Sequence, residues 1–309
     1  MWDDANGMSI HRFDSVLYQW IDTDDSNSLQ LLISDYPQLL GLLGKSLFQS
    51  NDTDSTVFFT KLKKYYSEPT LKNLYKDAIT LYDAHSPATR PIEQELSYGF
   101  TRMKELFPSI QIPAVYMHVS GLQQNMIVAD SLLSISIDKY LGDSYPLYAK
   151  FFYPYQRKNM LPACAAKDGL YAWLSSEYPF IEKERTLLNK MIYEGKMLYV
   201  LTQTGYNYSL QQMMQWTDKE YQWCQKNEAI VWKTLQANKL LYSADELTVS
   251  KFFSPAPSTF FSGEAPGNMG NFIGYRIVAS YMKQTKASIE ALMTNNNAQE
   301  ILKTSKYKP

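Results

Sequence analysis

The sequence has few cysteines, no long apolar run and almost no net charge. Cys164 and Cys224 are its two cysteines, too few for a disulfide framework, and no Cys-x-x-Cys pair or neighbouring histidine suggests a metal site. Because no run reaches about 18 apolar residues, no segment is predicted to span a membrane. The 30 basic and 31 acidic side chains leave a formal charge of −1, which argues against a basic nucleic-acid-binding surface.

The start of the chain also lacks a recognisable leader. Met1 to Asp4 are acidic and have no apolar core of the kind found in signal peptides. This start fits either a natural cytosolic protein or a chain that begins after a processed leader.

The composition is otherwise that of an ordinary globular protein. Apolar residues make up 45% of the 309 positions, which is enough for a sizeable core. That length fits about two domains on average, but no linker, internal repeat or long block of charge is visible. We therefore predict a single domain over residues 10–309, with a helical part at about 10–108 and a small sheet plus helices at about 109–309.

Helical spacing dominates both ends of the chain. The helices predicted before the middle are 29–48, with a break at Tyr36-Pro37, 56–66, 70–82 and 91–107. Those predicted after it are 157–173, 182–203, 217–235 and 267–284. Thr217 and Ser243 each open a capping box. The glycines at 270 and 274 share one helical face and favour close helix packing over a phosphate loop.

The middle of the chain changes to strand-like spacing. Residues 113–119, 125–128 and 132–137 are short runs of β-branched and aromatic side chains, separated by Gly121 and polar residues. In the third run Ser134 and Ser136 alternate with apolar residues, which indicates a sheet with one buried and one polar face. The sequence therefore predicts a mainly α fold with one small sheet, in the α+β class.

Charged side chains on the C-terminal helices are the first candidates for a binding or catalytic site. Glu194 lies in the middle of an apolar helical stripe, where a buried carboxylate needs a partner or a raised pKa. Its partner could be Arg276 or Lys196. Arg276 could instead pair with Glu264, or bind an anionic ligand inside a cleft.

Histidine and tryptophan supply the remaining candidates. His118, on a predicted strand, could line a site or be a hydrogen-bonded structural residue, and His11 and His85 lie far from it in the sequence. Trp223 could belong to an aromatic surface that binds sugar or peptide, although aromatic residues at helical spacing are more often core. The other members of that surface would be Trp216, Tyr221 and Trp232.

Several segments, in order, resemble the GldB family of gliding-motility-associated lipoproteins of the Bacteroidetes. Residues 10–14, Ile-His-Arg-Phe-Asp, resemble the family's Ile-x-Arg-Phe-Asp opening, and 134–145 resemble its strand followed by a Leu-Gly-Asp turn. The other similar segments are 191–196, 223–232, 266–282 and 301–309. The resemblance runs from about residue 10 to the end. It implies a lipoprotein signal and a lipidated cysteine upstream of residue 1.

A more distant resemblance is to the core of zincin-type metallopeptidases, in which strands precede two helices. Those enzymes carry His-Glu-x-x-His on the first helix and a glutamate on the second, which together hold Zn²⁺ and leave one position for water. Here the first helix would be 157–173, which has Leu161 to Ala166 in place of the motif, and only Glu194 remains. One carboxylate cannot retain zinc, so this resemblance implies a degenerate zincin-like core without a metal or other cofactor.

The GldB resemblance implies a non-catalytic envelope lipoprotein that faces the periplasm and acts as a binding or scaffold component. Its partners would be envelope, secretion or motility proteins and not nucleic acid. No amphipathic stretch is convincing as a membrane anchor, so membrane attachment would require the lipid anchor. Two alternatives stay open: a hydrolase on a zincin-like scaffold that uses Glu194 with Arg276 or His118, and a ligand-binding module with an aromatic-lined cleft around Trp223.

Overall fold

The structure is a computed structural model that describes residues 8–49, 56–83, 86–181, 185–204, 208–258, 260–261 and 264–309. Contacts within the chain divide it into two compact units, both discontinuous in sequence. The first comprises Met1–Ser97, Gln111–Tyr148 and Met160–Ala172, and the second comprises Tyr98–Ile110, Ala149–Asn159 and Trp173–Pro309. The single domain over residues 10–309 stays a prediction.

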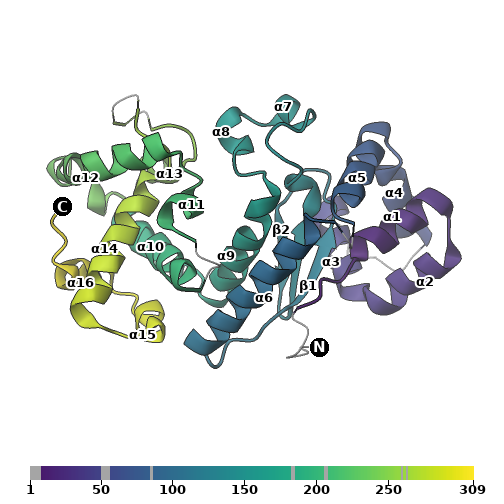
Figure 1. Ribbon diagram of the computed structural model, residues 1–309, viewed down its shortest axis with the longest axis horizontal. Helices are drawn as coiled ribbons and strands as arrows, with labels where there is room; N and C mark the ends of the chain where they lie inside the picture. Colours follow the sequence, from purple (N-terminus) through teal and green to yellow (C-terminus); the bar gives the residue numbers. More distant parts are fainter. Residues whose placement is uncertain are drawn as a thin grey trace. The chain divides into compact units, whose positions relative to one another are not determined.

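The first unit combines the N-terminal helices with the sheet (Figure 1). Its helices are α1 (Phe13–Thr23), α2 (Ser26–Asp35), α3 (Pro37–Phe48), α4 (Thr56–Tyr66), α5 (Pro69–Leu81), the first residues of α6 (Thr89–Leu106) and the first residues of α9 (Ala165–Glu177). Its strands and short 3-10 turns are β1 (Ala114–His118), β2 (Met126–Ala129), β3 (Leu132–Ser136), η1 (Ile137–Lys139) and η2 (Pro162–Cys164). The helices predicted before the sheet are confirmed, including the break at Tyr36-Pro37, where Pro37 opens α3.

The three predicted strands are confirmed and form one mixed sheet in the order β1-β3-β2. Strand β1 is parallel to β3, and β2 is antiparallel to it. His11 extends the sheet beyond β1 as an isolated parallel bridge with Tyr116. Its N–H donates to the carbonyl of Val115 at 2.8 Å, and its carbonyl accepts from the N–H of Met117 at 3.1 Å.

Strand β3 is buried along its whole length. The predicted polar row of Ser134 and Ser136 is present, but both side chains are as inaccessible as the apolar residues that alternate with them. A buried hydroxyl needs a hydrogen-bond partner. The sheet therefore carries a buried polar layer, which is described with the site below.

The second unit is helical. Its elements are the remaining residues of α6 and α9, α7 (Tyr148–Phe151, from Ala149), α8 (Pro154–Arg157), α10 (Leu187–Thr204), α11 (Leu210–Met214), α12 (Asp218–Ala237), η3 (Leu240–Tyr242), α13 (Glu246–Phe253), α14 (Met269–Thr285), α15 (Ile289–Thr294) and α16 (Ala298–Ser305). The fold is thus mainly α with one small sheet, as predicted, and a zincin-like core is not confirmed.

Helices α10 and α14 pack against each other at backbone distance (Figure 1). A Cβ atom built on Gly274 would lie 1.8 Å from the carbonyl oxygen of Met191, and one built on Gly195 would lie 2.3 Å from the carbonyl carbon of Gly274. Glycine is therefore required at both positions, because any side chain would push the helices apart. The predicted close packing of the Gly274 face is confirmed.

The predicted start of the helix over 182–203 lies outside the described residues, and α10 begins at Leu187. Two other predicted helix starts are wrong. The helix expected over 157–173 is broken: α8 ends at Arg157, and a 3-10 turn that Pro162 opens leads into α9, which begins at Ala165. The capping box expected at Ser243 is also absent. Asp245 caps α13 instead, since its carboxylate accepts from the N–H of Thr248 at 2.7 Å.

Candidate functional site

An open groove of about 600 Å³ lies along the first half of α12 and brings together two predicted site residues, Trp223 and Glu264. Its lining residues are Lys219, Glu220, Gln222, Trp223, Lys226 and Asn227 from α12, and Glu264 from the segment before α14. We call this set of residues the α12 groove.

The predicted capping box at Thr217 sets where α12 begins and so which face points outward. The Thr217 hydroxyl accepts from the N–H of Glu220 at 3.2 Å, and the Glu220 carboxylate accepts from the N–H of Thr217 at 2.8 Å. With this start, the buried face of α12 carries Cys224, Glu228, Val231, Trp232 and Leu235. Trp223 lies off that face and is partly exposed.

The charges of the α12 groove balance. Lys219 lies with its Nζ atom 3.2 Å from the carboxylate of Glu264, and Lys158 lies 3.1 Å from the carboxylate of Glu220. The Lys219–Glu264 pair is exposed, and an exposed ion pair contributes little to stability and exchanges readily with water. The Lys158–Glu220 pair is partly buried. The groove therefore offers one indole ring among hydrogen-bonding groups of both signs, a suitable surface for a neutral polar ligand with an apolar face.

Arg276 does not pair with the predicted partners. Its Nε atom donates to the carboxylate of Glu228, on α12, at 2.8 Å, so the predicted pairing with Glu194 or Glu264 is wrong. Burial works against the charge of Arg276, but the hydrogen bond and the negative charge of Glu228 raise its pKa.

Tyr307 completes a three-residue network with this pair. Its hydroxyl donates to the same Glu228 oxygen at 2.7 Å, and its ring contacts Trp232 edge-on at 5.1 Å. Burial and the Glu228 charge raise the pKa of Tyr307 far above its ordinary value, so it stays a neutral donor. The sequence prediction did not include this network. Its signal was Glu228, a carboxylate on the otherwise apolar buried face of α12.

His118 is fully buried inside the sheet. Its Nδ1 atom lies 2.8 Å from the Ser134 hydroxyl on the neighbouring strand, and its Nε2 atom has no hydrogen-bond partner within the residues that the structure describes. Burial lowers the pKa of His118 to about 3, so the ring is neutral at ordinary pH. Of the two roles that the sequence allowed for His118, this geometry favours the hydrogen-bonded structural residue.

Next to His118, the carboxyl ends of the parallel strands β1 and β3 hold a buried acid. Asp138 accepts from the Ser136 hydroxyl at 2.6 Å, from the N–H of Ser120 at 3.0 Å and from the N–H of Leu122 at 2.7 Å. Gly121 and Leu122 both have positive φ, of 71° and 66°, in the turn whose Ser120 and Leu122 N–H groups point to the carboxylate. Burial raises the pKa of Asp138, and these donors act against the rise.

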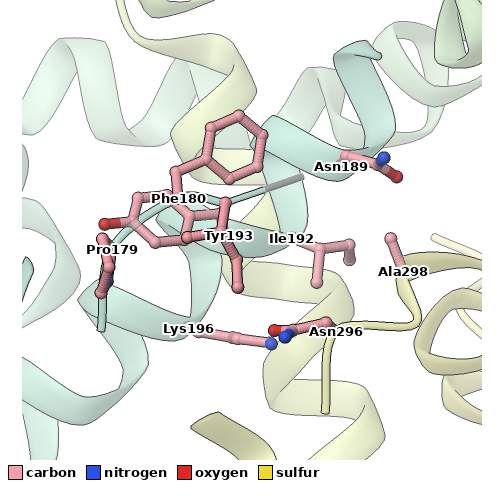
Figure 2. Close-up of a pocket in the computed structure, with 9 residues that line it drawn as sticks. Pro179, Phe180, Asn189, Ile192, Tyr193, Lys196, Asn296 and Ala298 are labelled. Carbon is pink, nitrogen blue, oxygen red and sulfur yellow. The ribbon is translucent and has the colours of Figure 1, made fainter. Parts of the chain in front are cut away.

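Glu194 is partly exposed, so the prediction that it is buried in an apolar stripe is wrong. It is in contact with other groups of the fold. The neighbouring Tyr193 and Lys196 line a pocket of about 20 Å³, with room for a single water molecule (Figure 2). Burial and the Glu194 charge raise the pKa of Tyr193 to about 12, and the Lys196 ammonium donates to the carbonyl of Asn295.

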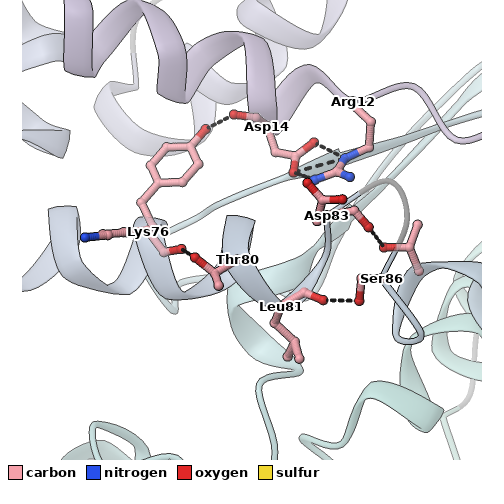
Figure 3. A network of polar contacts seen from close by, with 9 residues as sticks. Arg12, Asp14, Lys76, Thr80, Leu81, Asp83 and Ser86 are labelled. Carbon is pink, nitrogen blue, oxygen red and sulfur yellow. Dashed lines mark hydrogen bonds and ion pairs between the residues drawn. The ribbon is translucent and has the colours of Figure 1, made fainter.

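The opening segment 10–14 forms a second buried charge network. Arg12 donates to both oxygens of the fully buried Asp14, at 2.9 Å through Nε and at 2.6 Å through Nη2 (Figure 3). The Tyr75 hydroxyl donates to the backbone carbonyl of Asp14 at 3.0 Å. Asp83 adds a further negative charge that acts on Arg12. The motif residues thus fix the start of α1 against α5.

The candidate side chains do not assemble a metal centre. In the parts of the chain that the structure describes, no group of three or more His, Cys, Asp or Glu side chains is placed to hold a metal ion. Cys164 and Cys224 are buried free thiols, as predicted, and His85 lies outside the described residues. None of the described helices is long and apolar enough to cross a membrane.

Comparison with known proteins gives a single clear relation. No curated protein and no solved structure matches the chain. The model of one family, described as gliding motility protein GldB, matches residues 3–309, which is nearly the whole chain. The family is one of lipoproteins, which implies association with the cell envelope. The chain therefore belongs to the family of the gliding motility protein GldB.

Proposed function

We propose that this protein is a non-catalytic binding or scaffold component of the gliding-motility machinery, held in the envelope by a lipid anchor and facing the periplasm. We further propose that the α12 groove is the surface that contacts its partner. The family match supports an envelope protein associated with motility. The observation that carries the choice of surface is Trp223, a partly exposed indole flanked by side chains with exchangeable hydrogen bonds.

The state of the other candidate groups supports a binding role. A catalytic acid or base must reach its substrate and titrate near the working pH. His118 is buried with a pKa of about 3, and Arg276 is held by Glu228. These groups are committed to hydrogen bonds that hold the fold together.

The groove chemistry favours a saccharide or a polar peptide as the contacted group. An indole face stacks against the C–H face of a sugar or against an aromatic or proline side chain. Lys226 and Asn227, with the carboxylates of Glu220 and Glu264, supply donors and acceptors around it.

A photocrosslinking residue at Lys226, introduced into the protein in its native cells, tests the proposed surface. We expect a discrete crosslinked product that Trp223→Ala reduces at least about tenfold, because truncating a central aromatic residue usually removes a large part of the binding energy. Tyr242→Ala, at an exposed aromatic residue outside the groove, should leave the product unchanged. A product that is equal in both variants would show that the groove is not the binding surface.

Hydrolysis of a broad panel of peptides and glycosides is the outcome that would replace this proposal. If the wild type cleaves a substrate and Glu194→Gln abolishes cleavage, the hydrolase alternative holds. Elemental analysis of protein purified without chelator and without a metal-binding tag complements this test. Stoichiometric zinc would show that the protein has metal ligands that were not recognised in its sequence, and would favour the hydrolase alternative.

A further inference from the structure

Residues 149–158 form an exposed aromatic and basic segment that the proposed function does not use. We call it the α7–α8 tip, after the two short helices that it contains (Figure 1). Its sequence, Ala-Lys-Phe-Phe-Tyr-Pro-Tyr-Gln-Arg-Lys, holds four aromatic and three basic side chains and no acidic one. Lys158 is paired with Glu220 and Arg157 is only partly exposed, so Lys150 is the exposed cation of the tip.

Two of the four aromatic side chains of the tip are exposed, and the other two, Phe152 and Tyr155, are partly exposed. Phe151 is 64% exposed and Tyr153 is 67% exposed, while most aromatic rings of the protein are buried or partly buried. The rings of Tyr153 and Tyr155 stack at 5.6 Å with an angle of 11° between them. The exposed Tyr153 ring is thus held against the partly exposed ring of Tyr155. With Phe151 it gives the tip exposed apolar surface, which is typical of an interaction site.

Local bonds keep the tip in this conformation. The Gln156 side chain accepts from the N–H of Tyr153 at 2.9 Å, and Pro154 occupies the first turn of α8. Lys158 forms a partly buried ion pair with Glu220 at 3.1 Å. Since these bonds are already made, binding would order few additional groups.

We infer that the α7–α8 tip inserts into the headgroup region of a lipid bilayer and gives the protein a second membrane contact besides any lipid anchor. Tyrosine and phenylalanine rings suit this zone, where an apolar ring and a polar edge are both satisfied. Lys150, exposed beside Phe151, would face anionic headgroups. The segment is not an amphipathic helix, because α7 and α8 are each four residues long, and helical periodicity therefore does not reveal it.

Flotation of the 309-residue chain, carrying no lipid, with vesicles of equal parts phosphatidylcholine and phosphatidylglycerol tests the inference. We expect measurable partitioning that falls with rising salt and is weaker on pure phosphatidylcholine. The double variant Phe151→Ser/Tyr153→Ser should lower the partition coefficient at least about tenfold. The matched control is Ile230→Ser/Leu247→Ser, which changes two equally exposed apolar residues outside the tip and should alter it less than about twofold.

A fluorescence measurement separates insertion from loose surface attraction. Because Cys164 and Cys224 are buried, Ala149→Cys gives one accessible site for an environment-sensitive dye. Vesicles should shift its emission to the blue, whereas the same dye at Leu247→Cys should not respond. The inference is overturned if the wild type does not bind vesicles, if the tip variant binds as well as the wild type, or if both dyes respond alike. The groove crosslinking described above is unaffected by any of these outcomes.

Discussion

At the scale of single residues, the buried carboxylates Asp138 and Glu228 each lie in a hydrogen-bonded network. Asp138 accepts three hydrogen bonds from the strand ends, and Glu228 accepts from Arg276 and Tyr307. A buried charge left without such partners would cost several kcal/mol. The fold therefore depends on these hydrogen bonds. Replacing one residue of a network should measurably lower the free energy of unfolding.

His118 should make the stability of the protein depend on pH. Its pKa is about 3 in the folded state and about 6.5 in the unfolded chain, so between these values the unfolded state binds the additional proton. Stability is then fully present above about pH 6.5 and is lost as the pH falls toward 3. At pH 5 this contribution has fallen by about 2 kcal/mol.

Urea denaturation at pH 7 and pH 5 checks this effect by comparing the wild type with His118→Asn. Between pH 7 and pH 5 the free energy of unfolding of the variant should fall by about 2 kcal/mol less than that of the wild type. This difference does not depend on the stability of the variant at pH 7. The raised pKa of Asp138 acts in the opposite direction and is present in both proteins, so it cancels in the comparison. Equal losses would mean that His118 does not titrate as a buried neutral ring.

Tyr307→Phe should destabilise the second unit. It removes a hydrogen bond to the buried carboxylate of Glu228, a loss of about 1.5–3 kcal/mol for a charged partner. Tyr242→Phe is the matched control, because the Tyr242 hydroxyl makes an exposed 3.5 Å contact with Gln299. Chemical denaturation should separate the two variants, and similar midpoints would contradict the network described for Glu228.

At the scale of elements, the helix pair α10 and α14 depends on two glycines. Gly274→Ala should destabilise the protein by about 3 kcal/mol or more, because its methyl group would lie 1.8 Å from the carbonyl oxygen of Met191. Gly41→Ala is the control: it lies inside α3 with no atom within 4 Å of an added Cβ. That change should stabilise by about 0.5–1 kcal/mol. Thermal unfolding that moved in the same direction for both variants would refute the close contact.

Most elements were predictable from sequence because their signals are local. The helix over 56–66 and the strand over 132–137 are encoded in the spacing of adjacent residues, and α4 and β3 follow it closely. The start of α9 was not predicted, because Pro162 lies in a 3-10 turn that helical spacing alone does not distinguish. Non-local partners were the second limit: Tyr307 and Glu228 are 79 residues apart, and no local pattern relates them.

The residues of the candidate site could be predicted from sequence only in part. Trp223 and Glu264 do line one groove, but the sequence offered no reason to prefer this pair over Glu194 and Arg276. Which side of α12 faces outward depends on what packs against its other side. The α7–α8 tip escaped notice for a related reason, since exposure is a property of the folded chain and not of composition.

At the scale of the whole molecule, the two units share continuous helices. Helix α6 runs past the boundary at Ser97 and α9 runs past the one at Ala172. Because a helix melts cooperatively along its length, we expect a single unfolding transition in which the calorimetric and van't Hoff enthalpies agree. Two resolved transitions would contradict the prediction of one domain over residues 10–309.

The His11 bridge gives the chain a defined path for mechanical load. Tension on the chain ahead of Met8 would first meet the hydrogen bonds that the N–H groups of Met8 and Ile10 donate to Ser97 at 3.4 Å and Glu93 at 3.3 Å. It would then reach the two backbone bonds between His11 and β1. Behind them, the Arg12–Asp14 pair and the Tyr75 hydroxyl hold the first turn of α1. A pull on this end would therefore be carried by the edge of the sheet and by α5, and not by α1 alone.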